Sequence, residues 1–227
     1  MSDRRTEILR AATRVIARRG VRGLRVGELA AEAGVSTSLI YYHFVDRAGI
    51  LRRTLEYIND RADRYTAERG AEELDPRADL EQALLLELQD TAEVRENSTA
   101  WGELRASAIF EPDLREALAK ATLTWIHETA ELIGRVRPQG TAPAHAAAAE
   151  RLTSLLEGLS MRWLSGSLPI EHARRLLAEA IAVELDAIGS EALSLGGSAP
   201  EVGVPEAVAD SDRQSLTEFS VDATVKA

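Results

Sequence analysis

The sequence contains no cysteine, so disulfide bonds, thiolate metal sites and a cysteine nucleophile are all excluded. It also lacks any run of about 18 uncharged apolar residues, the length that a membrane-spanning helix requires. The first segment, MSDRRTEILRAATRVIARRG, holds no apolar run of signal-peptide length. These absences favour a protein of the cytoplasm, a reducing compartment, with no membrane as its partner.

Strand signals are also missing, because valine, isoleucine and threonine nowhere form runs with a period of two. Alanine, leucine, glutamate and arginine dominate, and apolar residues recur at helical spacing throughout the chain. With 227 residues the chain is long enough to bury a sizeable core. We therefore predict an all-α protein.

Signatures of catalysis and metal binding are absent as well. The histidines form neither an H-E-x-x-H pair nor the paired E-x-x-H motifs of carboxylate bundles; they are His43, His127, His145 and His172. No G-x-S-x-G nucleophile elbow and no glycine-rich phosphate loop occurs. The sequence thus predicts no enzyme, no metal site and no cofactor.

Aromatic residues are scarce and charge is unevenly spread. The chain has 3 Trp, 4 Tyr and 3 Phe, yet three of these ten stand in the segment GVSTSLIYYHF, residues 34–44. Residues 1–55 hold 11 Lys and Arg against 5 Asp and Glu, whereas residues 56–227 hold 16 against 32. The net charge of -10 therefore conceals a basic N-terminal segment, which predicts binding of a polyanion there.

The helical periodicity breaks at glycine and proline, which gives approximate helix boundaries. The first helix should end at Gly20, and Gly34 permits a sharp turn between the second and third helices. Ser36 and Asp46 are suitable N-caps for the third and fourth. The later helices are predicted at 26–33, 36–44, 47–69, 77–90, 92–109, 112–136, 144–166 and 170–188.

Two short helices joined by a glycine-containing turn, within a basic segment, are typical of a helix-turn-helix, whose second helix enters the major groove of DNA. Six apolar side chains should pack against the first helix, namely Leu29, Ala30, Ala33, Val35, Ile40 and Phe44. The opposite face of the third helix would then be free to meet DNA. There Tyr41, Tyr42 and His43 can donate hydrogen bonds to phosphate oxygens.

The stretch from Gly23 to Leu51, GLRVGELAAEAGVSTSLIYYHFVDRAGIL, resembles the DNA-binding signature of the TetR family of transcriptional regulators. The resemblance implies that Ser36 caps the recognition helix. It further implies that base edges are faced by Thr37, Ser38 and Leu39, and that the DNA backbone is held by Tyr41, Tyr42 and His43. Leu39 replaces a small polar residue common in the family, which predicts contact with a thymine methyl group.

Several arginines are candidates for phosphate contacts. Arg47 stands where the family usually has lysine, at a helix N-terminus that itself favours a phosphate. Arg25 replaces a usual serine or threonine near the start of the second helix. For the other arginines a solvated helix face and a phosphate contact both stay open; they are Arg4, Arg5, Arg10, Arg14, Arg18, Arg19 and Arg22.

The C-terminal part carries a second, looser resemblance. Residues 152–186 are similar to the C-terminal domain of the BetI-like branch of this family, which implies a small-molecule effector and a dimer formed through 144–166 and 170–188. The candidate pocket residues are Trp101, Phe110, Trp125, His127, Glu157 and Met161. A stripe of Leu152, Leu156, Leu159 and Trp163 is typical of a core or a subunit interface, with a pocket wall as the alternative.

We therefore predict a homodimeric, ligand-responsive repressor that a small molecule releases from a palindromic operator in double-stranded DNA. Residues 1–46 would form the DNA-binding domain, 47–188 the regulatory and dimerisation domain, and 189–227 a disordered acidic tail. Two other classes stay open. One is a helical bundle that binds or converts a small molecule without acting through DNA, and the other is a protein-interaction module that docks through the helix-turn-helix.

Overall fold

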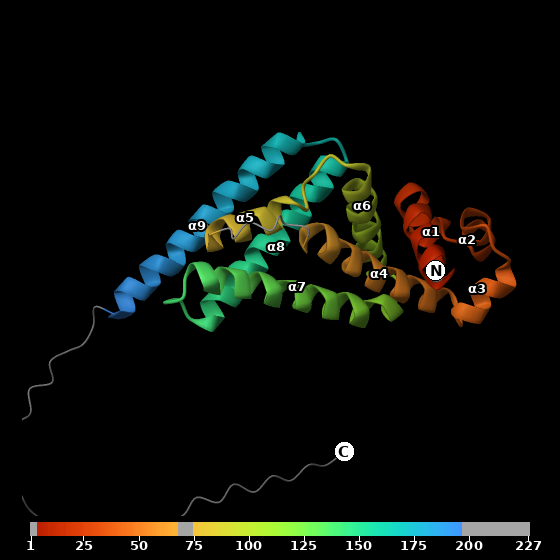
Figure 1. The fold of residues 1–227 in the computed structure, drawn as a ribbon, viewed down its shortest axis with the longest axis horizontal. Helices are drawn as coiled ribbons and strands as arrows, with labels where there is room; N and C mark the ends of the chain where they lie inside the picture. The colour runs from red at the N-terminus through yellow and green to blue at the C-terminus, as the bar shows by residue number, and fades with distance from the viewer. Residues whose placement is uncertain (1–3, 68–74, 197–227) are drawn as a thin grey trace, which may run out of the picture.

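The computed structural model describes residues 4–67 and 75–196, and every regular element in these ranges is a helix. The α-helices and two short 3₁₀ helices (η) are α1 (Arg4–Arg19), η1 (Val21–Gly23), α2 (Val26–Ala33), α3 (Thr37–His43), α4 (Arg47–Ala67), α5 (Pro76–Leu85), α6 (Ala92–Ser107), η2 (Pro112–Leu114), α7 (Arg115–Val136), α8 (Ala142–Leu164) and α9 (Ile170–Gly196). The all-α prediction is confirmed. We call residues 4–46 the head and the described residues of 47–196 the body. The head lies at one end of the molecule's long axis, next to α6 and the start of α4, and α9 of the body forms the other end (Figure 1).

Glycines set the helix ends in the head, as the sequence predicts. α1 ends at Arg19, and Gly20 follows with φ 70°. Gly34 closes α2 with φ 64° and ψ 37°, a left-handed conformation that costs a glycine little, and its N–H donates to the carbonyl of Ala31. This turn directs the chain from α2 into α3, so it sets the angle between these two helices.

One apolar core is shared by the head and the body. Its fully buried members include Ile8, Ile16, Leu29, Ile40, Ile50, Leu51, Leu55, Ile58 and Leu104. Because Leu104 lies on α6 and Leu51 on α4, the packing continues across the predicted boundary between residues 46 and 47. The division into a DNA-binding domain and a regulatory domain at this boundary stays a prediction about function. Structurally, the core joins the two parts.

A second core lies within the body and is built from α5, α7, α8 and α9, together with Val94 at the start of α6. The predicted stripe on α8 belongs to it, since Leu152, Leu156, Leu159 and Trp163 are only 1 to 5% exposed. The core interpretation of the stripe is therefore right, and the subunit interface is wrong for these four residues.

Several body boundaries differ from the prediction. α5 ends at Leu85, because the chain then tightens: Leu88 N–H donates to the carbonyl of Leu85 at 3.1 Å. The predicted helix 112–136 begins as η2 before α7 starts at Arg115. α9 continues to Gly196, since helix-forming residues follow Gly189, so the predicted tail of 189–227 begins too early. Its remainder, 197–227, lies outside the described residues.

No helix in the described part of the chain has the length and apolar character that crossing a membrane requires.

Candidate nucleic-acid interface and effector site

The recognition helix α3 is fixed by one face and exposed on the other. Ile40 is completely buried and Phe44 is 3% exposed, so both hold α3 against the shared core. Ser36 Oγ accepts a hydrogen bond from Leu39 N–H at 3.2 Å, which confirms the N-cap. On the outward face Tyr41 and Tyr42 are 55% and 82% exposed. Two tyrosine hydroxyls therefore stand in solvent on a firmly packed helix.

The remaining predicted DNA-contacting residues surround these tyrosines. Thr37 and Ser38 are exposed in the first turn of α3, and Leu39 and His43 are half-buried. The His43 ring meets the Tyr42 ring edge to face, with 5.2 Å between centroids. Arg25 is exposed at the N-cap of α2, and its side chain has no ion pair in the described part of the chain. All of these side chains are accessible to a large ligand.

Arg47 is placed differently from the prediction, because its guanidinium points into the junction between head and body. Nη2 donates to the carbonyl of Val21 at 2.8 Å, and Nε donates to that of Leu24 at 3.4 Å. Nη1 forms an ion pair with Glu111 at 2.9 Å. The carbonyls belong to the head and Glu111 to the segment after α6. Arg47 thus ties the two parts together, a role that the local sequence does not reveal.

A second carboxylate strengthens the same junction. Glu103, on α6, accepts a hydrogen bond from Val21 N–H at 3.3 Å. A Cβ at Gly20 would come within 2.7 Å of Glu103 Oε2, so Gly20 serves the close approach of α6 as well as its own positive φ. Glu103 therefore binds η1 directly, and Glu111, in the segment after α6, holds it through Arg47.

Several head arginines bind carboxylates of α2 and so join α1 to α2. Arg14 pairs with Glu32 at 2.6 Å, Arg18 pairs with the same carboxylate, and Arg19 pairs with Glu28. Arg14, Arg18 and Arg19 therefore do more than line a solvated helix face or wait for a phosphate, because each forms an ion pair with α2. They stabilise the helical arrangement that presents α3.

The Glu32 pairs predict an acid-sensitive head. The hydrogen bond from Arg14, with a further one from Arg18, lowers the pKa of Glu32 below its usual value. A lowered folded-state pKa gives stability that is complete above the ordinary glutamate pKa and is lost as pH falls through the lowered one. Glu32→Gln should cost about 1 kcal/mol in unfolding free energy at neutral pH. Denaturation across acidic pH should show this difference shrinking towards zero; a constant difference would contradict it.

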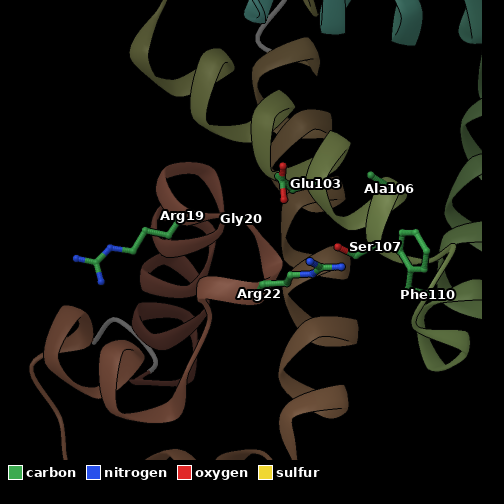
Figure 2. A pocket seen from close by; sticks show the side chains of 7 residues that line it. All are labelled: Arg19, Gly20, Arg22, Glu103, Ala106, Ser107 and Phe110. Carbon is green, nitrogen blue, oxygen red and sulfur yellow. The ribbon is translucent and has the colours of Figure 1, made fainter.

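Phe110 does not join the other predicted effector residues. It is 73% exposed and lines an open groove of about 360 Å³ between the head and α6 (Figure 2). The other lining residues are Arg19, Gly20, Arg22, Glu103, Ala106 and Ser107. Arg22 extends from the head towards Ser107 across this groove (Figure 2). Phe110 follows α6 at the junction with the head, so its prediction as part of an enclosed apolar pocket is wrong.

Three predicted effector residues do meet, at the contact of α6 with α8. Trp101 Nε1 donates to Glu157 Oε1 at 3.1 Å, and Met161 lies against Gly102, where a Cβ would come 2.5 Å from the Met161 sulfur. Arg105 completes the group, since its Nη2 forms an ion pair with Glu157 at 2.5 Å. Sequence reasoning missed Arg105, although its spacing of four residues from Trp101 places both on one helix face.

The other two candidates lie elsewhere. Trp125 on α7 is half-buried and packs against the body core. His127 is exposed, with its Nε2 3.2 Å from Glu131 Oε1 on the same outward face of α7. The prediction of His127 as a polar anchor inside a pocket is therefore wrong for the chain as described, because its helix turns that face to solvent. Within the described residues no cluster of metal-binding side chains occurs either.

The short, exposed α3 behind a glycine turn, on a head that packs against a helical body, defines a helix-turn-helix regulator. Comparison with known proteins agrees. Residues 8–54 match the bacterial regulatory proteins of the tetR family, and residues 76–186 match the C-terminal domain of BetI-type transcriptional repressors. The chain belongs to the TetR family, and it is a ligand-responsive, DNA-binding regulator of transcription rather than an enzyme.

Individual relatives support this assignment. A solved structure assigned as a TetR-family regulator from Rhodococcus sp. is 46% identical, with a TM-score of 0.75 over 82% of this chain and 100% of that one. A regulator from Saccharomonospora viridis in complex with choline is 29% identical, with a TM-score of 0.68 over 80% and 97%. The regulator BetI of Burkholderia mallei is 28% identical over 171 residues, 73% of this chain and 82% of the relative.

Proposed function

We propose that this regulator is a cytoplasmic, homodimeric repressor that reads a palindromic operator with α3. The observation that carries the proposal is the outward face of α3, which presents tyrosine hydroxyls to solvent while Ile40 and Phe44 fix the helix from behind. Thr37, Ser38 and Leu39 would face base edges. Phosphates would be held by Arg25, Tyr41, Tyr42 and His43.

A dimer is part of this proposal because one short recognition helix reads only a few base pairs, and two of them on a palindrome multiply specificity. In the described body, α8 and α9 still expose apolar side chains after the stripe is buried: Leu155 is 37% exposed and Val183 is 67% exposed. These outward faces are the proposed contact between subunits. Light scattering at micromolar concentration should give the mass of two chains, and a monomer would contradict the dimer.

Selection of bound fragments from random duplex DNA tests the proposed function directly. We expect a palindrome whose half-sites are separated by about one helical turn of DNA. The logarithm of the affinity should fall steeply with the logarithm of the salt concentration, with a slope of about 0.9 per phosphate contacted. If no sequence is enriched, the proposal fails, because an operator-reading head must discriminate between sequences.

Two substitutions should separate base reading from phosphate binding. Leu39→Ala should change the preference at a single base pair by about 1 to 3 kcal/mol, because a lost apolar contact to one base affects only that position. Tyr42→Phe should weaken all sequences alike, because a phosphate contact carries no base information. Competition binding with operators mutated at one position at a time measures both. A uniform loss for Leu39→Ala would place its side chain away from the bases.

We also propose that the effector binds where α6 and α8 meet, at Trp101, Glu157 and Met161. An indole face beside a carboxylate is a suitable environment for an organic ammonium group. The Saccharomonospora viridis relative is in complex with choline, which carries such a group. The two recognition helices of the dimer would fit successive major grooves in one conformation and not in the other. An effector that binds the second conformation more tightly would lower the affinity for the operator, by a factor equal to the ratio of its affinities for the two conformations.

A further inference from the structure

The position beside the Trp101 ring and Glu157 is already occupied by a cation of the protein itself. The Arg105 guanidinium lies over the Trp101 ring, with its central carbon 5.4 Å from the ring centroid. Its Nη2 pairs with Glu157 at 2.5 Å and donates to Thr122 Oγ1 at 2.9 Å. Arg105 therefore makes the two contacts, to an aromatic face and a carboxylate, that an ammonium effector would need.

The charges restrict which effector can replace this pair. The side chains of Arg105 and Glu157 are 34% and 22% exposed, so each is partly removed from water and neutralises the other. A simple cation that took the place of Arg105 would leave the guanidinium without its carboxylate. A simple anion that took the place of Glu157 would leave the carboxylate unpaired. Either outcome costs free energy, because a partly buried charge loses its partner.

A zwitterion avoids both costs, because it carries one charge for each member of the pair. We propose that the effector is a compact zwitterion with an ammonium group and a carboxylate, and that it inserts between Arg105 and Glu157. This inference rests on the proposed effector site. The ammonium group lies against the Trp101 ring and Glu157. The carboxylate binds the guanidinium, whose planar fork suits two parallel hydrogen bonds.

An unused donor supports the assignment of the carboxylate to Arg105. The Nε of Arg105 is buried and has no hydrogen-bond partner in the described part of the chain. A buried donor without a partner costs about 1 to 3 kcal/mol. A carboxylate that approaches the Nε and Nη2 edge of the guanidinium satisfies this donor. The pair in its present form thus leaves a hydrogen bond that an anionic group can complete.

The location of Arg105 also connects the effector to the head. Residues 101 and 105 lie on the face of α6 that meets α8, whereas residue 103 lies two positions away, on the opposite side of the helix. Glu103 on that opposite side holds Val21 of the head. A zwitterion that separates Arg105 from Glu157 shifts α6 relative to α8, and the head is attached to the same rigid helix.

Three probes of similar size test the proposal by calorimetry on the full chain. Trimethylglycine carries both charges, choline carries the ammonium group only, and 3,3-dimethylbutyrate carries the carboxylate only. We expect trimethylglycine to bind at least about tenfold more tightly than either single-charge probe, because a factor of this size corresponds to one hydrogen bond to a charged group. Equal affinities, tighter binding of choline, or no binding of trimethylglycine would overturn the zwitterion.

Substitutions should then exchange the preference. Arg105→Gln should weaken trimethylglycine about tenfold and leave choline as the better ligand, whereas Arg105→Lys should retain the original order. Glu157→Gln should favour 3,3-dimethylbutyrate instead. Arg95→Gln is a matched control, because Arg95 lies over the Trp163 ring at 4.7 Å and pairs with the exposed Asp90, away from this group. An unchanged order in Arg105→Gln would overturn the proposal.

The operator distinguishes this failure from failure of the proposed function. Each variant should still bind the selected operator, which also shows that it is folded. If choline releases the operator and trimethylglycine does not, the zwitterion is wrong and the repressor with an effector at Trp101 and Glu157 stands. If no operator exists but trimethylglycine binds with the predicted order, the binding site stands and the repressor is wrong.

Discussion

Arg47→Ala is expected to lower the free energy of unfolding by about 2 kcal/mol. The guanidinium donates to the carbonyls of Val21 and Leu24 and pairs with Glu111, so its removal leaves three acceptors without their donor. Hydrogen bonds to a charged group are worth about 1.5 to 3 kcal/mol, and partial exposure reduces their sum. Denaturant unfolding monitored at equilibrium measures the loss.

The same variant decides between two roles for this arginine. If Arg47 bound phosphate, as the family resemblance implies, its loss would reduce the salt slope of DNA binding by about 0.9 and leave stability unchanged. If it ties the head to the body, stability falls and the effector's influence on DNA binding falls with it. Arg52→Ala, an exposed arginine in the next turn of α4, is the control and should change stability by less than about 0.5 kcal/mol.

Leu104→Ala should destabilise head and body together, by about 2 to 5 kcal/mol. Leu104 is 1% exposed and lies on α6, yet it belongs to the core that also contains Ile16 and Ile40 of the head. The cavity left by the shorter side chain therefore lies between the two parts. Because the core is continuous, we expect one cooperative transition whether unfolding is followed by tryptophan fluorescence from the body or by hydrogen exchange in α1.

A second leucine provides the comparison. Leu123 on α7 is 67% exposed, so Leu123→Ala should cost less than about 0.5 kcal/mol by the same measurement. Two separate transitions in the Leu104→Ala protein, with the head unaffected, would show that the head has an independent core. Equal losses in the two variants would show that burial of Leu104 contributes little.

Local signals made the head predictable from the sequence. Gly20, Gly34 and Ser36 act within a few residues of their own positions, and the structure has the helix ends and the cap that they predict. The tail boundary was less accurate, because Gly189 does not end α9 and good helix formers follow it. Glycine inside a helix weakens it without necessarily terminating it.

For the candidate sites too, the features set by nearby residues were predictable and those set by distant residues were not. The exposed face of α3 follows from the spacing of Ile40 and Phe44, both of which are local to the helix. The pair of Arg105 with Glu157 and that of Arg47 with Glu111 join residues 52 and 64 positions apart, and no sequence pattern indicates such partners. For His127 and Phe110 the sequence offers only the residue type, and it is the path of α7 and the end of α6 that turn both side chains to solvent.

The core that continues from α1 into α6 has a practical meaning for protein engineers who build hybrid regulators. A chimera joined at residue 46 would separate the head from Leu104. It would expose to solvent the apolar side chains of the head that pack against Leu104. The graft should therefore carry the C-terminal half of α6, with Glu103, along with the transplanted DNA reader. To give this protein a new DNA specificity, an engineer would therefore have to exchange two stretches that lie far apart in the sequence, the head and the C-terminal half of α6.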